Sequence, residues 1–355
     1  MKTAFTIVAL VVFALALHVP ARAQDGAPKG MGALDILDGL NSHDAARRDR
    51  ASGELQRMDI KTAENLGSEI LRGGVREAET ALLALGQADC KNAVVSCSVA
   101  LDAEEKTVRI AALDALTTIA PIRVSEGGAK HLNQKRLEII RKLVAESDYI
   151  KQLCEGVTED DKGGLIVPVR RLLSLTILMD RFFGVKGMPM LLKRIGEYML
   201  GDKPEDDDKK TTTQRATEER LRRGAEACCK SVWISDPAIQ FNYTPNSPFE
   251  DRQKAVARLT AATEKMQETE VELGDRKYVG LRYGDHLRNI MGSDVVSAVA
   301  YLRFQWWMGE DVKIVGEGYA EAVDDVNALS NRELRRLRGT ITKWWTEYRA
   351  ATELK

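Results

Sequence analysis

Side chains that commonly do chemistry are few in this sequence and lie far apart along it. Beyond residue 23 it has three histidines, His43, His131 and His286, and none has a metal-ligating residue three or four positions away on the same helix face. His286 follows Asp285, and a carboxylate can orient an imidazole as a general base, although adjacent residues at a turn usually point in different directions. The His-Glu-x-x-His, Gly-x-Ser-x-Gly, phosphate-loop and dinucleotide-binding patterns are absent. We therefore predict no catalytic, cofactor-binding or metal-binding residues.

Carboxylates cluster at two places, and both are explained more simply as solvated surface than as sites. The run Glu205–Asp208 lacks the alternating ligands and the glycine of a calcium-binding loop. It falls within residues 201–213, which we predict to be a charged linker or exposed loop. Asp324 and Asp325 are adjacent, as on the exposed face of a helix.

The cysteines do not form a recognisable framework. There are five, an odd number, at Cys90, Cys97, Cys154, Cys228 and Cys229. If Cys90 and Cys97 share one helix, two turns separate their Cα atoms by about 10.5 Å, which exceeds the roughly 7 Å limit for a disulfide. We expect most of them to be small core residues. Redox activity or soft-metal binding at Cys228 and Cys229 is the alternative, and the disulfide state of Cys154, Cys228 and Cys229 stays open.

The elements that would position these residues are predicted to be helices. Val108, Ala111, Ala115 and Ile119 follow one another at i, i+3, i+7 and i+11 and so line one helix face, which Leu116 widens. Asp114 is expected on the opposite, solvent-facing side. The same reasoning predicts helices over residues 34–40, 47–58, 62–71, 75–86, 92–101, 108–119, 132–144, 149–154, 169–183, 188–200, 217–232, 252–259 and 295–308, and a last one from about 334 to 348. Residues 279–283 and 312–315 are the only strand-like runs, either a small hairpin or loops. The predicted fold class is all-α.

Three of the predicted helices share a spacing that resembles the second helix of a HEAT repeat. When Arg48, Arg76 and Arg109 are placed at equivalent positions, a leucine follows each seven residues later, at Leu55, Leu83 and Leu116. Residues 37–55 are also similar to repeats in exported bacterial HEAT-like proteins, and the resemblance covers about residues 33–121. It implies an α-solenoid of antiparallel helix pairs, used as a scaffold or binding surface, with no family-wide catalytic residues. Glu79 stands where a small apolar residue is expected, so the register of the second unit stays open.

The first residues have the three parts of a secretory signal peptide. Lys2 is followed by an apolar run over residues 4–17 and then by Ala21-Arg22-Ala23. A membrane anchor is the alternative, but the run is shorter than the roughly 20 residues that span a bilayer. We divide the chain into a signal peptide (1–23), a flexible leader (24–32), HEAT-like repeats (33–200), the charged linker or loop (201–213) and a less regular C-terminal helical region, 214–355, with divergent repeats as one interpretation.

Charge and architecture together indicate the class of function. Removal of residues 1–23 leaves 50 basic against 53 acidic residues, a net charge of −3, which gives no support to nucleic acid as a partner. We expect a periplasmic or secreted, non-enzymatic scaffold that binds another protein or an envelope component, without a transmembrane span in the mature chain. A structural envelope component, or an enzyme whose site is assembled from distant residues, is the alternative.

The last predicted helix ends in adjacent tryptophans, Trp344 and Trp345, which point about 100° apart. One of them is expected to close the edge of the apolar stripe, and the other to lie nearer its rim. The helix is then either a cap over the last exposed face of the helix array or a docking surface for a partner.

The signal peptide leads to a first prediction. The exported protein should begin at Gln24, because Ala21 and Ala23 provide the small residues that signal peptidase requires. Intact-mass measurement of the protein from the envelope or the medium should show loss of residues 1–23. Retention of Met1 and Lys2 in the envelope fraction would instead indicate an uncleaved anchor.

Overall fold

The computed structural model describes a chain built almost entirely from helices. It describes residues 30–88, 90–119, 130–159, 165–203, 210–267, 270–273, 276–279 and 285–287, and, between 330 and 350, residues 330, 332, 335–336, 338–339, 342–343, 345–347 and 350. All the elements below belong to one compact unit, Met31–Lys355. The predicted signal peptide, the helix over 295–308, Asp324 and Asp325 lie outside the described residues.

The helices are α1 (Ala33–Leu40), α2 (Ala45–Leu55), α3 (Ile60–Arg72), α4 (Val75–Ala88), α5 (Ala93–Ala100), α6 (Lys106–Thr118), α8 (Gln134–Glu146), α9 (Tyr149–Glu155), α10 (Val169–Phe183), α11 (Gly187–Leu200), α12 (Thr212–Trp233), α13 (Pro237–Phe241) and α14 (Phe249–Glu264), with short 3-10 turns at Gly184–Lys186 and Lys265–Gln267. The predominantly α-helical class predicted from the sequence is confirmed.

Side-chain caps explain where several helices begin. Asp44, Asp59, Asn133, Thr211 and Asp236 accept hydrogen bonds from the first backbone N–H groups of α2, α3, α8, α12 and α13.

Two small antiparallel hairpins interrupt the helices. β1 (Thr158–Glu159) pairs with β2 (Leu165–Ile166), and β3 (Glu270–Leu273) pairs with β4 (Arg276–Val279). The sequence analysis did not predict β1, β2 or β3. Val279, where it placed the start of a strand, is the last residue of β4, and the partner of β4 is the adjacent strand β3. Residues 280–283 and 312–315 lie outside the described part of the chain.

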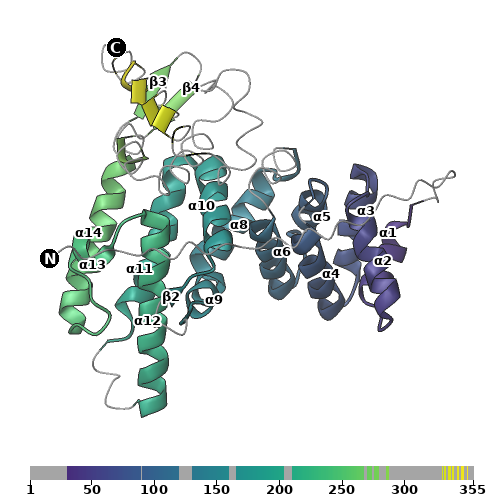
Figure 1. Ribbon diagram of the computed structural model, residues 1–355, viewed down its shortest axis with the longest axis horizontal. Helices are drawn as coiled ribbons and strands as arrows, with labels where there is room; N and C mark the ends of the chain where they lie inside the picture. Colours follow the sequence, from purple (N-terminus) through teal and green to yellow (C-terminus); the bar gives the residue numbers. More distant parts are fainter. Residues whose placement is uncertain are drawn as a thin grey trace. The chain divides into compact units, whose positions relative to one another are not determined.

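The first six helices form three successive pairs that pack in two layers. α1, α3 and α5 contact one another in order, and so do α2, α4 and α6 (Figure 1). Each first helix also contacts the second helix of its own pair. Further along, α10 packs on α6, and α11 and α12 pack on each other. The loop between α11 and α12, which includes most of residues 201–213, therefore connects two helices in contact.

An arginine near the start of a helix binds the turn before it at four places. In each case Nη1 donates to a backbone carbonyl five residues earlier, and in two cases also to the carbonyl six residues earlier, at distances between 2.5 and 2.9 Å. The bonds join Arg48 to Ser42 and His43, Arg109 to Ala103 and Glu104, Arg136 to His131, and Arg252 to Ser247. Carbonyls at a turn lack helical partners, and a charged guanidinium is a strong donor to them. We call this bond the arginine clamp.

The residue seven positions after each clamp arginine is a buried leucine. Leu55, Leu116, Leu143 and Leu259 are at most 4% exposed. Two helical turns separate the clamp from the leucine, so the arginine binds the turn while the leucine fills the core on the same side of the helix. The sequence spacing indicated this arrangement for Arg48 and Arg109, and the structure adds Arg136 and Arg252.

Hydrogen bonds join each helix pair to the next at a nearly constant distance along the chain. Polar side chains that bond between 32 and 36 residues away link Asn41 to Glu77, Gln56 to Ala88, Cys90 to Leu55, Asn92 to Met58, Ser96 to Ala63, Arg136 to Asp102 and Thr117 to Tyr149. Most of the acceptors are backbone carbonyls near helix ends. The bonds of Ser96 and Thr117 are buried, and because buried polar groups are costly without partners, these two help to fix how successive pairs stack.

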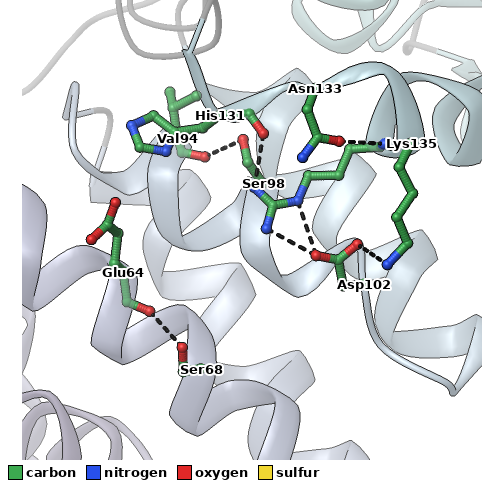
Figure 2. A network of polar contacts seen from close by, with 9 residues as sticks. Glu64, Ser68, Val94, Ser98, Asp102, His131, Asn133 and Lys135 are labelled. Atoms are coloured by element: carbon green, nitrogen blue, oxygen red, sulfur yellow. Dashed lines mark hydrogen bonds and ion pairs between the residues drawn. The ribbon is translucent and has the colours of Figure 1, made fainter.

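The contact between Asp102 and Arg136 shows one of these bonds between helix pairs in detail. Its carboxylate accepts from Arg136 Nη2 at 2.9 Å and lies 3.1 Å from Lys135 Nζ (Figure 2). Partial burial raises the pKa of Asp102, but hydrogen bonds from Arg136 and Lys135 outweigh it, so the net pKa is lowered. The arginine thus clamps its own turn through Nη1 and holds the preceding pair through Nε and Nη2.

The second pair departs from the predicted register by one residue. Leu83, predicted to match Leu55 and Leu116, is 55% exposed, whereas Leu82 is fully buried. Seven residues before Leu82 stands Val75, so the clamp position of α4 holds no arginine. The turn before α4 is only Gly73-Gly74, and the Glu77 side chain accepts from the Gly74 N–H. A turn this short leaves fewer unpaired carbonyls for a clamp to satisfy.

The face assigned to α6 is confirmed at Leu116 and needs correction at Asp114. Leu116 is fully buried. Asp114 was placed on the opposite, solvent-facing side, but its carboxylate is 3.2 Å from Arg171 of α10, which packs on α6. Burial raises the pKa of Asp114, and Arg171 opposes that shift. The sequence period identified the apolar face but not that a later helix covers the polar one.

Small residues let the stacked helices approach closely. Gly67 of α3 faces α5, and a Cβ atom placed on it would lie 2.6 Å from Val99 Cβ. Gly53 of α2 offers a contrast, because nothing lies within 4 Å of the position that its Cβ would take.

The terminal helix is anchored by one of its two tryptophans. Trp345 is fully buried within the main hydrophobic core, and its Nε1 donates to Asp285 Oδ1 at 2.9 Å. Trp344 lies outside the described residues. Of the two interpretations of this helix, the burial of Trp345 favours the cap.

The two glycines give a matched test of helix packing. Gly67→Ala should lower the free energy of unfolding by about 1–3 kcal/mol, because the methyl group forces α3 and α5 apart. Gly53→Ala should raise it by about 0.5–1 kcal/mol, because alanine loses less backbone entropy in an exposed helix. Urea denaturation followed by circular dichroism measures both. Equal effects of the same sign would mean that α3 and α5 do not pack as described.

The cap interpretation gives a second test. Trp345→Ala should destabilise the protein by about 3–5 kcal/mol through the cavity and the lost hydrogen bond to Asp285. Lys343→Ala, an exposed change two residues away, should stay within about 0.5 kcal/mol of the wild type. Thermal melts of both variants decide between the two roles: a Trp345→Ala protein that melts like the wild type would favour a docking surface.

Candidate functional site

The histidines considered from the sequence lie in three separate places. His43 is exposed in the turn before α2, and the backbone carbonyls of His43 and His131 accept the arginine clamps of the helices that follow them. The ring of His286 stacks on Trp233 of α12, with ring centroids 4.6 Å apart. Asp285 instead binds Trp345. Asp285 and His286 therefore each contact a different tryptophan.

The cysteines are all free thiols, four of them buried. Cys90 precedes α5, where its thiol donates to the Leu55 carbonyl at 3.2 Å, so it does not share a helix with Cys97. Burial raises the pKa of the Cys97 and Cys229 thiols, which keeps both protonated at neutral pH. Most of the cysteines are core residues, as predicted.

The acid-rich loop after α11 is closed at its base by ion pairs. Lys210 Nζ lies 3.0 Å from Asp202 and 2.5 Å from Glu218. Residues 204–209, with the carboxylates considered for calcium, lie outside the described residues. Among the described residues, no three histidine, cysteine or acidic side chains are placed to hold a metal ion.

Polar side chains converge at a recess between the first two helix pairs. It has a volume of about 470 Å3 and is lined by Leu37, Asp38, Asn41, Ser42, His43, Asp44, Arg47 and Glu77. These residues come from the end of α1, the turn that follows it, the start of α2 and the first turn of α4. We call this the first-pair recess.

The backbone around the first-pair recess is held by several hydrogen bonds. Asn41 Nδ2 donates to the carbonyls of Leu37 at 3.0 Å and of Glu77 at 3.4 Å, which joins α1 to α4. Asp44 accepts from the Ala46 N–H at the start of α2, and Arg48 clamps the turn from outside the recess. These bonds hold the turn between α1 and α2 and connect it to α4.

The first-pair recess has an excess of negative charge. Three carboxylates (Asp38, Asp44 and Glu77) face one guanidinium, Arg47, so its net charge near neutral pH is negative when His43 is neutral. Asp44 and Glu77 also accept backbone N–H bonds, whereas no ion pair within the described part of the chain involves Asp38. The arrangement suits a cationic side chain better than an anion. Ser42 and His43 also line it; the Ser42 hydroxyl accepts from the Asp44 N–H at 3.1 Å, and among the described residues no hydrogen bond joins it to the His43 ring.

A larger groove of about 690 Å3 runs along the terminal helix. The described residues that line it, Arg335, Arg338, Gly339, Thr342, Lys343, Thr346 and Glu347, all belong to that helix. Its described lining is of mixed charge, with Lys343 Nζ 4.0 Å from Glu347. The first-pair recess, where separate elements meet, is the stronger candidate.

Sequence reasoning identified the turn of the first-pair recess but not the recess itself. Residues 41–44 were recognised as the connection between two helices, whereas Glu77 reaches them only because α4 stacks beside α1 and α2. The one available signal was Asn41, an amide at a helix end, which can bond a neighbouring chain segment as well as its own helix.

The comparisons with known proteins add no residue to this candidate site. No helix in the described part of the chain is both long enough and apolar enough to cross a membrane. No protein-family model, curated protein or solved structure matches the chain.

Proposed function

We propose that this protein is an exported, non-enzymatic scaffold, an α-solenoid of HEAT-like repeats that binds another protein or an envelope component. The observation that favours it most is the ladder of hydrogen bonds between helix pairs at separations of 32–36 residues. A repeat protein buries its core only between neighbouring units, so such ties are what a stacked array requires.

The recurrence of the arginine clamp supports the same proposal. A clamp with a buried leucine seven residues later occurs at Arg48, Arg109, Arg136 and Arg252, and thus extends into the C-terminal helical region. Repeats of this kind form extended surfaces that bind other macromolecules. Export rests on the signal-peptide pattern of residues 1–23.

The first-pair recess is our candidate for contact with the partner. Its fixed turn and negative charge suit a protein segment that inserts a lysine or arginine side chain beside Asp38. Interfaces of this kind depend on a few well-placed groups, so one charge reversal should be enough to detect the site.

Two aspartates of α1 give a matched experiment. Asp38 lines the first-pair recess and Asp35 does not, although both are exposed on the same helix. The mature chain is tagged at its C-terminus and used to capture proteins from the envelope of the cells that produce it. We expect Asp38→Lys to reduce capture of the main wild-type partner at least about 10-fold, which corresponds to about 1.4 kcal/mol. Asp35→Lys should leave capture within about 2-fold.

Three outcomes would count against parts of this proposal. Equal loss with both variants would indicate general electrostatic attraction, and loss with neither would exclude the first-pair recess as the contact. Failure of the wild-type chain to enrich any protein or envelope component would contradict the scaffold function. Circular dichroism of each variant verifies that capture is measured on folded protein.

A further inference from the structure

Three buried cysteines meet where α9 packs on α12. Cys154 lies in the last turn of α9, and Cys228 and Cys229 lie in α12. All three side chains are at most 1% exposed. Neither the proposed scaffold function nor the first-pair recess uses them.

Gly224 brings the two helix backbones together at this point. A Cβ atom on Gly224 would lie 2.2 Å from the Cys154 carbonyl oxygen, so no other residue fits there without moving a helix. Cys228 follows Gly224 by four residues, one helical turn, and therefore points to the same side of α12. Its thiol lies 3.9 Å from the carbonyl oxygen of Leu153, the neighbour of Cys154.

The Cys154 and Cys228 thiols face each other across this contact. A hydrogen bond with the Cys228 thiol raises the pKa of Cys154, and burial raises it further. Cys229 is the next residue along α12 and so points about 100° away from Cys228. Of the two adjacent cysteines, Cys228 is therefore the one on the side of α12 that meets α9.

We propose that Cys154 and Cys228 are a disulfide-forming pair that joins α9 to α12 under oxidising conditions. The oxidant is a small disulfide such as oxidised glutathione, or a protein disulfide of the same chemistry. One thiolate attacks the oxidant and releases one thiol, and the second thiolate then displaces the other thiol from the mixed disulfide. In balance, two cysteine thiols and one external disulfide give the Cys154–Cys228 disulfide and two external thiols.

The reaction has to occur while the chain folds. In the folded protein both thiols are buried, and the raised pKa of Cys154 keeps it protonated. Thiol–disulfide exchange requires an accessible thiolate. The bond closes a long loop through α10 and α11, and loops of this length lose much entropy from the unfolded state when they are closed. The disulfide should therefore stabilise the folded chain.

The test refolds the full chain from reducing denaturant, either with a mixture of oxidised and reduced glutathione or with a reductant alone. After the remaining thiols are blocked, trypsin should release residues 152–162 joined to residues 224–230 from the oxidised sample only. Thiol titration of the oxidised protein after denaturation should find three of the five cysteines free. The melting temperature should rise by roughly 5–15 °C relative to the reduced protein.

Alanine variants show which cysteine of α12 takes part, because Cys228 and Cys229 lie in the same peptide. Cys228→Ala should abolish both the linked peptide and the rise in melting temperature, whereas Cys229→Ala should keep both. A link that persists in Cys228→Ala, or five free thiols in wild-type protein refolded with glutathione, would overturn the proposal. If Cys228→Ala does not fold, Cys229→Ala decides alone: a linked peptide that persists in it must use Cys228, and a lost one overturns the proposal.

Discussion

The backbone carbonyls at the turns between helices are the constraint on which the rest of this structure depends. These carbonyls have no partner within a helix, and the bonds that satisfy them range from exposed at Ser42 to part-buried at Ala103. The arginine clamp satisfies them within a pair, and the amide, hydroxyl and thiol donors of the next pair satisfy others. A guanidinium has five N–H groups, so Arg136 can hold its own turn and Asp102 of the preceding pair together. The clamp therefore links local structure to stacking.

Close packing is the second requirement, and it explains the composition of the stacked faces. Gly67 allows α3 to approach α5, and Gly224 allows α12 to approach α9, each at a point where a methyl group would collide. Short distances between helices leave little room for a deep pocket in the helix pairs. The first-pair recess forms instead at the surface, where a turn and the start of a helix meet.

α12 connects the two regions that the sequence analysis separated at residues 201–213. It packs on α9, α10 and α11, and its last residue, Trp233, contacts both Phe241 and His286. Asp285, beside His286, receives the hydrogen bond from Trp345 of the terminal helix. A disulfide between Cys154 and Cys228 would fasten this same helix to α9. The contacts of α12 thus give the C-terminal helical region a shared core in place of the regular pairs found earlier in the chain.

The sequence by itself determined the helical class, most helix bounds and the buried faces, because the apolar period and the capping residues are local properties. Residues 169–183 were predicted as one buried helix, and α10 has those bounds. It could not decide the register of α4, because Leu82 and Leu83 are equally apolar and only the packing of α4 against its neighbours, above all α6, buries the first and leaves the second exposed. Nor could it show that Asp114 meets Arg171, that Glu77 joins the first-pair recess, or that Cys154 faces Cys228. Those pairs are far apart along the chain, and only the stacking of whole helices brings them together.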